Sequence, residues 1–175
     1  MEHKILEIEI KAYNDNPVEV KEKLSNIGAK YIETREERDI YFNHPSRDFG
    51  KTDEALRLRF VKGRCLITYK GPKLSNETKA RIEHETGIED IEVFSLILNA
   101  LGFTKSGEVK KNRELYLLYD MEITLDSIDG LGEFVEIEKQ CPMSTDAEKE
   151  LFDTAARLGL SRFERRSYLE LKYFS

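Results

Sequence analysis

Apolar and charged residues alternate along several short stretches of this chain, and the first of them is LEIEIK at residues 6–11. A β-strand sends successive side chains to opposite faces. The stretch therefore separates into an apolar face with Leu6, Ile8 and Ile10 and a charged face with Glu7, Glu9 and Lys11. Alone, this pattern is typical of a half-buried strand whose polar side faces water.

The same alternation returns downstream, and charge again occupies one parity of each stretch. The charged positions are Arg57 and Arg59 in ALRLRF, Lys70 in TYKGPK, Lys79, Arg81, Glu83 and Glu85 in KARIEHE, Lys111 and Arg113 in KKNRELY, and Glu136 and Glu138 in GEFVEIEK. If these strands share one sheet, the charges line up on one surface. A flat sheet would expose that surface to water, whereas a closed barrel would turn it inward as a polar tunnel.

Helix signals separate the strand-like stretches. Asn16 is placed as an N-cap, Pro17 follows at the first helical position, and Gly28 provides a C-terminal stop, which together predict a helix between Asn16 and Gly28. Two further helices are predicted at 88–101 and 145–158, and a polar loop is predicted at 43–54.

The strands follow one another mainly as hairpins rather than in strict strand–helix alternation, and about eight are predicted. This order favours an α+β fold: a closed or nearly closed eight-stranded antiparallel β-barrel with helices packed outside. In such a fold the apolar parity of each strand faces the helices and the charged parity faces the lumen. The hydrophobic core would then lie outside the barrel wall.

Composition narrows the class of protein. With 175 residues, of which 39% are hydrophobic, we expect a single domain over residues 1–175. The net charge of −6 gives no general attraction to nucleic acid or to anionic membranes. No apolar run approaches the ~18 residues that span a bilayer, and the N-terminal residues lack a signal-peptide pattern. We expect a cytoplasmic protein, monomeric or homodimeric, that binds neither nucleic acid nor membrane.

Cysteine and histidine are sparse and scattered. Cys65 and Cys141 are isolated from each other and from every histidine, and His3, His44 and His84 stand beside no serine or cysteine in a nucleophile motif. This spacing predicts reduced structural thiols and indicates neither a zinc site nor a catalytic triad.

The charged motifs, taken in order, resemble those of the CYTH superfamily. That superfamily contains class IV adenylyl cyclases, thiamine triphosphatases and inorganic tripolyphosphatases, and it has a triphosphate tunnel fold. The resemblance covers nearly the whole chain and rests on an ExExK signature, an arginine pair, a lysine before a loop, a later basic pair and an acidic strand. In this sequence they are Glu7, Glu9 and Lys11; Arg57 and Arg59; Lys70; Lys111 and Arg113; and Glu136 and Glu138.

The resemblance implies a site with two kinds of side chain. Glu7, Glu9, Glu136 and Glu138 would hold one or two divalent cations, Mg²⁺ or Mn²⁺, which prefer such oxygen ligands. The phosphate-binding residues would be Lys11, Arg57, Arg59, Lys70, Arg81, Lys111 and Arg113. Glu7, Glu9 and Lys11 would be the catalytic group. Lys79 is a further candidate for phosphate binding and could alternate with Arg81. Asp126 is a candidate for orienting a metal ligand or water. For both residues, a side chain that simply faces water on an exposed strand is an equal alternative.

The implied function is that of a divalent-metal-dependent enzyme acting on a nucleoside triphosphate, tripolyphosphate or thiamine triphosphate. The stretches DGLGEFVEIE and SYLELKY are most similar to the class IV adenylyl cyclase-like branch. Bacterial cyclases of this family carry a His-Phe pair before ExExK, whereas here His3 precedes Lys4 at a different spacing, which favours hydrolysis.

Two alternatives to hydrolysis stay open at this point. One is a true class IV cyclase that makes cyclic AMP and pyrophosphate from ATP. The other is a non-catalytic polyphosphate or nucleotide binder. Paired carboxylates favour catalysis over simple binding, because an anion site gains nothing from acidic groups unless a metal lies between them.

Overall fold

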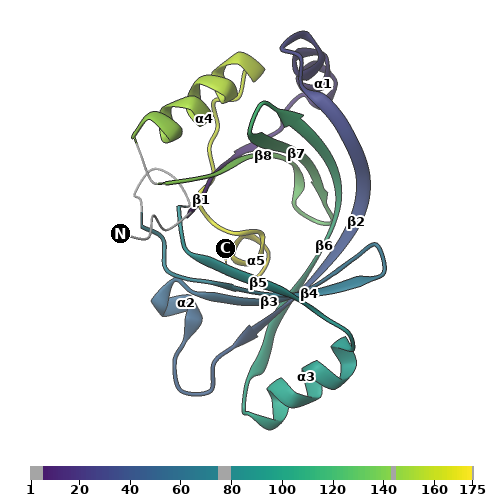
Figure 1. Cartoon of the computed structure of the whole chain (residues 1–175), viewed down its shortest axis with the longest axis vertical. Coiled ribbons are helices and arrows are strands. Elements are labelled where there is room, and N and C mark those ends of the chain that lie inside the picture. The colour runs from purple at the N-terminus through teal and green to yellow at the C-terminus, as the bar shows by residue number, and fades with distance from the viewer. Residues whose placement is uncertain (1–5, 75–79, 143–144, 175) are drawn as a thin grey trace.

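Eight antiparallel strands form one strongly curled sheet in the computed structural model, which describes residues 6–74, 80–142 and 145–174. The strands are β1 (Leu6–Tyr13), β2 (Lys30–Asn43), β3 (Ala55–Val61), β4 (Arg64–Lys70), β5 (Glu83–Ile88), β6 (Thr104–Leu118), β7 (Met121–Ile128) and β8 (Gly132–Cys141). Their spatial order is β1-β8-β7-β6-β2-β3-β4-β5. Figure 1 looks into the resulting ring of strands. The predicted eight-stranded antiparallel fold is confirmed.

Five helices accompany the sheet within the described ranges. They are α1 (Pro17–Asn26), α2 (Phe49–Thr52), α3 (Ile91–Ala100), α4 (Thr145–Leu158) and α5 (Tyr168–Tyr173). The three predicted helices are present as α1, α3 and α4. The segment predicted as the polar loop 43–54 contains α2, whose single turn is too short to give a helical period, and α5 was not predicted. No described helix is both long and apolar enough to cross a lipid bilayer.

The curled sheet is an open barrel, because its edge strands β1 and β5 do not form a regular ladder. One isolated bridge joins β1 to the residues just before β5, where the backbone N–H of Arg81 donates to the carbonyl of Glu7 at 3.2 Å. Farther along β1, the backbone N–H of Glu164 donates to the carbonyl of Lys11 at 2.8 Å. Two segments distant in sequence therefore cover the unpaired edge of β1.

The hydrophobic core lies outside the wall, as the alternation predicts. The outward-facing residues Ile8, Ile10, Leu56, Leu58, Val135 and Ile137 are all buried. One cluster joins β1, β7 and β8 to the buried faces of α1 and α4, and a second joins β2 and β3 to α2 and α3. Each fully buried aliphatic side chain contributes roughly 1.5–3 kcal/mol, so helix packing stabilises the wall from outside. A third, smaller cluster joins Val109, Ile128 and Phe134 to Tyr168 and Leu171 of α5.

Helix α5 lies inside the ring of strands in Figure 1, and its residues line the lumen. Its approach to β6 depends on Gly107. A Cβ at that position would lie 2.5 Å from Leu169 Cδ1 and 2.8 Å from Tyr173 Cε2. The Tyr173 hydroxyl donates to the Glu108 carbonyl at 2.9 Å and accepts from its N–H at 3.2 Å. The missing side chain at position 107 thus lets the C-terminal helix dock.

We expect Gly107→Ala to displace α5, because the added methyl group would lie closer to Leu169 and Tyr173 than van der Waals contact allows. Overpacking of this kind costs about 1–3 kcal/mol. Hydrogen exchange of the α5 amides should accelerate, and the thermal unfolding midpoint should fall. The control is Gly87→Ala, where the nearest atom to the added Cβ, the Cys65 carbonyl oxygen, is 3.9 Å away. Equal α5 protection in the two variants would contradict this account of the docking.

Candidate functional site

A cavity of about 770 Å³ occupies the lumen, between the inner faces of the strands, the α2 region and α5. The predicted site residues that line it are Glu7, Glu9, Lys11, Arg57, Arg59, Lys70, Arg81, Lys111, Arg113, Glu136 and Glu138. Asp126 is fully buried in the wall behind them. Lys79 lies outside the described residues, as do His3 and Lys4. The alternation of charge therefore brings the described candidates to one cavity.

Three of the predicted metal ligands form a compact carboxylate cluster. Glu7, Glu9 and Glu138 each offer an oxygen, and these oxygens all lie within 4.8 Å of one another. Glu9 and Glu138 face each other directly across β1 and β8. Burial, reinforced by the charges of Glu7 and Glu9, raises the pKa of Glu138 to about 8. Oxygen-only donors at this spacing suit a hard divalent cation such as Mg²⁺ or Mn²⁺.

The fourth predicted ligand, Glu136, lies on the same face of β8 but beside a cation. Its Oε2 is 2.5 Å from Nη2 of Arg113. An ionised pair at this distance forms a charge-assisted hydrogen bond. Glu136 therefore joins the basic part of the lumen in this arrangement, and its part in metal binding stays a prediction.

Two arginines in the lumen are each held by a buried aspartate on the neighbouring strand. Arg59 donates through Nε and Nη2 to the two oxygens of Asp39, at 2.7 and 2.8 Å. Arg113 donates to Asp126 in the same manner, at 2.7 and 2.5 Å. Each aspartate faces its arginine directly in the strand register. Burial opposes ionisation of Asp39, but the charges of Arg59 and Arg57 outweigh it and hold its pKa well below the usual range.

Arg57 is held less completely. Its Nη2 donates to Thr68 Oγ1 at 3.1 Å and lies 3.5 Å from the Glu85 carboxylate. Its Nη1 lies 3.8 Å from Asp39. Its Nε is buried and has no hydrogen-bond partner in the part of the chain that the structure describes. Arg57 therefore lines the cavity but is held by longer contacts than Arg59.

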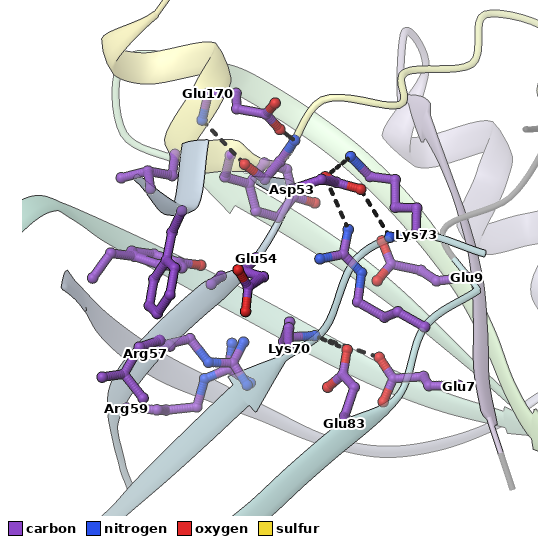
Figure 2. Close-up of a pocket in the computed structure, with 18 of the residues that line it drawn as sticks. Glu7, Glu9, Asp53, Glu54, Arg57, Arg59, Lys70, Lys73, Glu83 and Glu170 are labelled. Carbon is purple, nitrogen blue, oxygen red and sulfur yellow. Dashed lines mark hydrogen bonds and ion pairs between the residues drawn. The ribbon is translucent and has the colours of Figure 1, made fainter. Parts of the chain in front are cut away.

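Cations near the seam between β1 and β5 are paired with partly exposed acids. Figure 2 shows Lys70 pointing toward Glu83 and Glu7, at 2.5 and 3.5 Å. Lys73 donates through Nζ to Asp53 at 2.7 Å, and its backbone N–H donates to the same carboxylate at 2.8 Å. Lys73 lines the cavity but was not predicted, because it lies in a loop after β4 where alternation gives no signal.

The C-terminal segment adds a further residue that the alternation could not show. Tyr168 of α5 donates to Asp126 Oδ2 at 2.9 Å, and its ring centroid lies 4.0 Å from the ammonium of Lys11 and 5.4 Å from that of Lys111. Lys11 also donates to the carbonyl of Arg166. The predicted catalytic lysine is thus oriented by the tail of the chain.

Glu37 should make the protein sensitive to acid. Burial opposes its ionisation, but Lys111, Arg59 and Arg113 outweigh that effect and lower the pKa of Glu37 from 4.5 to about 2. Because the folded-state pKa is depressed, the ionised group stabilises the fold above pH 4.5, and this stabilisation is lost as the pH falls toward 2. Glu37→Gln should therefore be less stable than the wild type at pH 7, by about 3 kcal/mol.

Denaturant unfolding of the wild type and Glu37→Gln across pH 2–7 checks this prediction. The difference in unfolding free energy should shrink as the pH falls through the window from 4.5 to about 2. The exposed neighbour Glu36 supplies the control variant, Glu36→Gln. A difference that stays constant with pH would contradict an ionised Glu37 paired in the folded state.

Comparisons with known proteins agree with this architecture. The CYTH domain model matches residues 6–168. A Methanocaldococcus jannaschii protein described as a candidate adenylate cyclase is 40% identical over 173 residues, covering 96% of this chain and 99% of that protein. The adenylate cyclase CyaB of Aeromonas hydrophila is 29% identical over 147 residues, covering 80% and 74% of the two chains.

A solved structure from Pyrococcus horikoshii OT3 is 40% identical to this chain. It superposes with a TM-score of 0.86 over 95% of this chain and 97% of its own. The family match therefore includes the first strand, the acidic strand β8 and the start of the C-terminal helix α5. The chain belongs to the CYTH domain family.

Proposed function

We propose that this protein is a Mg²⁺- or Mn²⁺-dependent enzyme that hydrolyses a triphosphate compound inside the barrel lumen. The observation that carries this proposal is the placement of a three-carboxylate cluster and a set of buried cations around one cavity. Carboxylates alone would repel a polyanion, and cations alone would need no acidic cluster. A metal ion with its triphosphate satisfies both halves of the site.

The donor set fits a hard divalent ion. Glu7, Glu9 and Glu138 would hold it, with Glu136 as a further candidate ligand. When bound, such an ion polarises a phosphoryl oxygen and lowers the pKa of a coordinated water. The carboxylates of the chain would fix the position of that chemistry at the end of the lumen where β1 meets β8.

The basic residues would bind and orient the phosphate chain. Arg57 lines the cavity and is held by longer contacts than Arg59, so its guanidinium could turn toward a phosphate oxygen. Lys70 and Arg81 are paired with acids that a phosphate oxygen can replace. Lys11, Arg59, Lys111 and Arg113 would contribute positive charge around the reacting phosphorus, because charge built up in phosphoryl transfer is stabilised by fixed cations.

Cyclisation is a second candidate reaction, and the relatives favour it by name, since two of them are described as adenylate cyclases or candidates for that activity. In that reaction a ribose hydroxyl attacks the α-phosphorus of ATP and pyrophosphate leaves. The same cations and carboxylates would serve both reactions, so the products rather than the charges distinguish them.

A product-resolved assay tests the proposal. Tripolyphosphate, ATP and thiamine triphosphate are each incubated with Mg²⁺ or Mn²⁺, and the products are separated. Release of orthophosphate supports hydrolysis, whereas cyclic AMP with pyrophosphate supports cyclisation. Absence of metal-dependent turnover with all three compounds would overturn the proposed function, and binding without turnover would indicate a non-catalytic binder.

We expect Glu9→Gln to abolish metal-dependent turnover while the protein stays folded. The amide keeps the shape of the side chain but removes a charge that holds the ion, so raised Mg²⁺ should restore only part of the activity. Turnover and circular dichroism are measured beside the control Glu36→Gln, an exposed residue of β2. Wild-type turnover in Glu9→Gln would contradict the assigned metal site.

A further inference from the structure

The arginine pair of β3 is supported from β2 by an aspartate that has no assigned role. Asp39 is 1% exposed and does not itself line the cavity. It accepts two parallel hydrogen bonds from Arg59 and lies 3.8 Å from Arg57. One carboxylate therefore acts on both members of the pair.

The two arginines are left with different bonding capacity. Arg59 uses Nε and Nη2 on Asp39, and its Nη1 lies 3.0 Å from Glu37. A guanidinium has five N–H donors, so this pairing fixes the plane of Arg59 while some donors remain. Arg57 is attracted by Asp39, but at 3.8 Å the two are too far apart for a hydrogen bond, and the buried Nε of Arg57 has no partner among the described residues.

The fixed guanidinium of Arg59 affects how the cavity would bind a polyanion. A side chain held in advance by two bonds pays no ordering cost when the reacting group arrives. Asp39 also stays ionised at neutral pH, because the arginine charges outweigh its burial. A single buried anion that binds Arg59 through two hydrogen bonds and attracts Arg57 from 3.8 Å would hold both guanidinium groups at the cavity wall, with Arg57 left to donate to a phosphate oxygen.

We propose that Asp39 is a positioning residue, which locks Arg59 and thereby aligns Arg57 for contact with the triphosphate. This inference rests on the proposed function, because it concerns the same cavity. The equivalent fork between Asp126 and Arg113 shows that the lumen uses this device twice, on β2–β3 and on β6–β7.

The chain contains a matched control on the outer face of the sheet. Arg38 donates through Nε and Nη2 to the two oxygens of Glu108, at 2.7 and 3.2 Å. This fork also joins neighbouring strands, β2 and β6, but it is exposed. Glu108→Gln thus removes a carboxylate from a similar fork outside the cavity.

Asp39→Asn is compared with Glu108→Gln in tripolyphosphate hydrolysis and by NMR of the arginine Nε–H groups. We expect kcat of Asp39→Asn to fall about 10- to 100-fold through misalignment. KM should stay unchanged or decrease, because the arginine charges are less neutralised. The protected Nε–H signal of Arg59 should be lost, and Glu108→Gln should match the wild type. A merely structural role would lower the apparent kcat only in proportion to the folded fraction measured by circular dichroism, and kcat per folded molecule would stay at the wild-type value.

Asp39→Glu provides the second variant if Asp39→Asn does not fold, since it keeps the charge but moves it by one methylene. It should show the same loss of kcat with little change of KM. The wild type offers an independent measurement, because adding tripolyphosphate should shift the Arg57 Nε–H signal.

Wild-type kinetics in Asp39→Glu or Asp39→Asn, or an unmoved Arg57 signal during normal turnover, would overturn the positioning role and leave the proposed function intact. If the wild type neither binds nor hydrolyses the triphosphates, the proposed function itself fails, and the positioning role fails with it.

Discussion

Charge pairing between neighbouring strands is the constraint on which the rest of this structure depends. Curling the sheet with its charged face inward buries arginines, lysines and acids that would each be costly to bury alone. The register solves this by placing opposite charges side by side, as with Asp39 and Arg59 or Asp126 and Arg113. The apolar face can then pack under the helices, so the inward charges and the outward core are two results of one alternation.

The ion pairs differ in how deeply they are buried, and this difference decides which cations a ligand in the lumen could bind. Asp39 and Asp126 are almost fully buried and hold their arginines from behind. Nearer the seam, Lys73 pairs with Asp53, whose side chain is 41% exposed. A phosphate oxygen can replace such a partner more easily than a buried one. Beside these cations, Glu7, Glu9 and Glu138 collect negative charge that a metal ion would neutralise.

Strand alternation was sufficient to predict the strands, the outward core and most of the lining of the cavity, because parity alone decides which face a side chain takes. It could not identify Asp39, since β2 carries charge on both parities: Glu37 and Asp39 are buried while Glu36 and Arg38 are exposed. Tyr168 was missed because its place depends on how the tail crosses the lumen. Glu136 pairs with Arg113, whereas Glu7, Glu9 and Glu138 form the acidic cluster. This difference depends on the register between strands, which alternation does not give.

The proposed function requires that metal and triphosphate meet inside the lumen at the acidic cluster. The most direct measurement is anomalous diffraction from crystals soaked with Mn²⁺ and tripolyphosphate. We expect a manganese peak among Glu7, Glu9 and Glu138, about 2–2.5 Å from carboxylate oxygens, with phosphate density reaching Arg57. Manganese bound outside the lumen, with the three carboxylates contacting no metal while tripolyphosphate occupies the cavity, would contradict it.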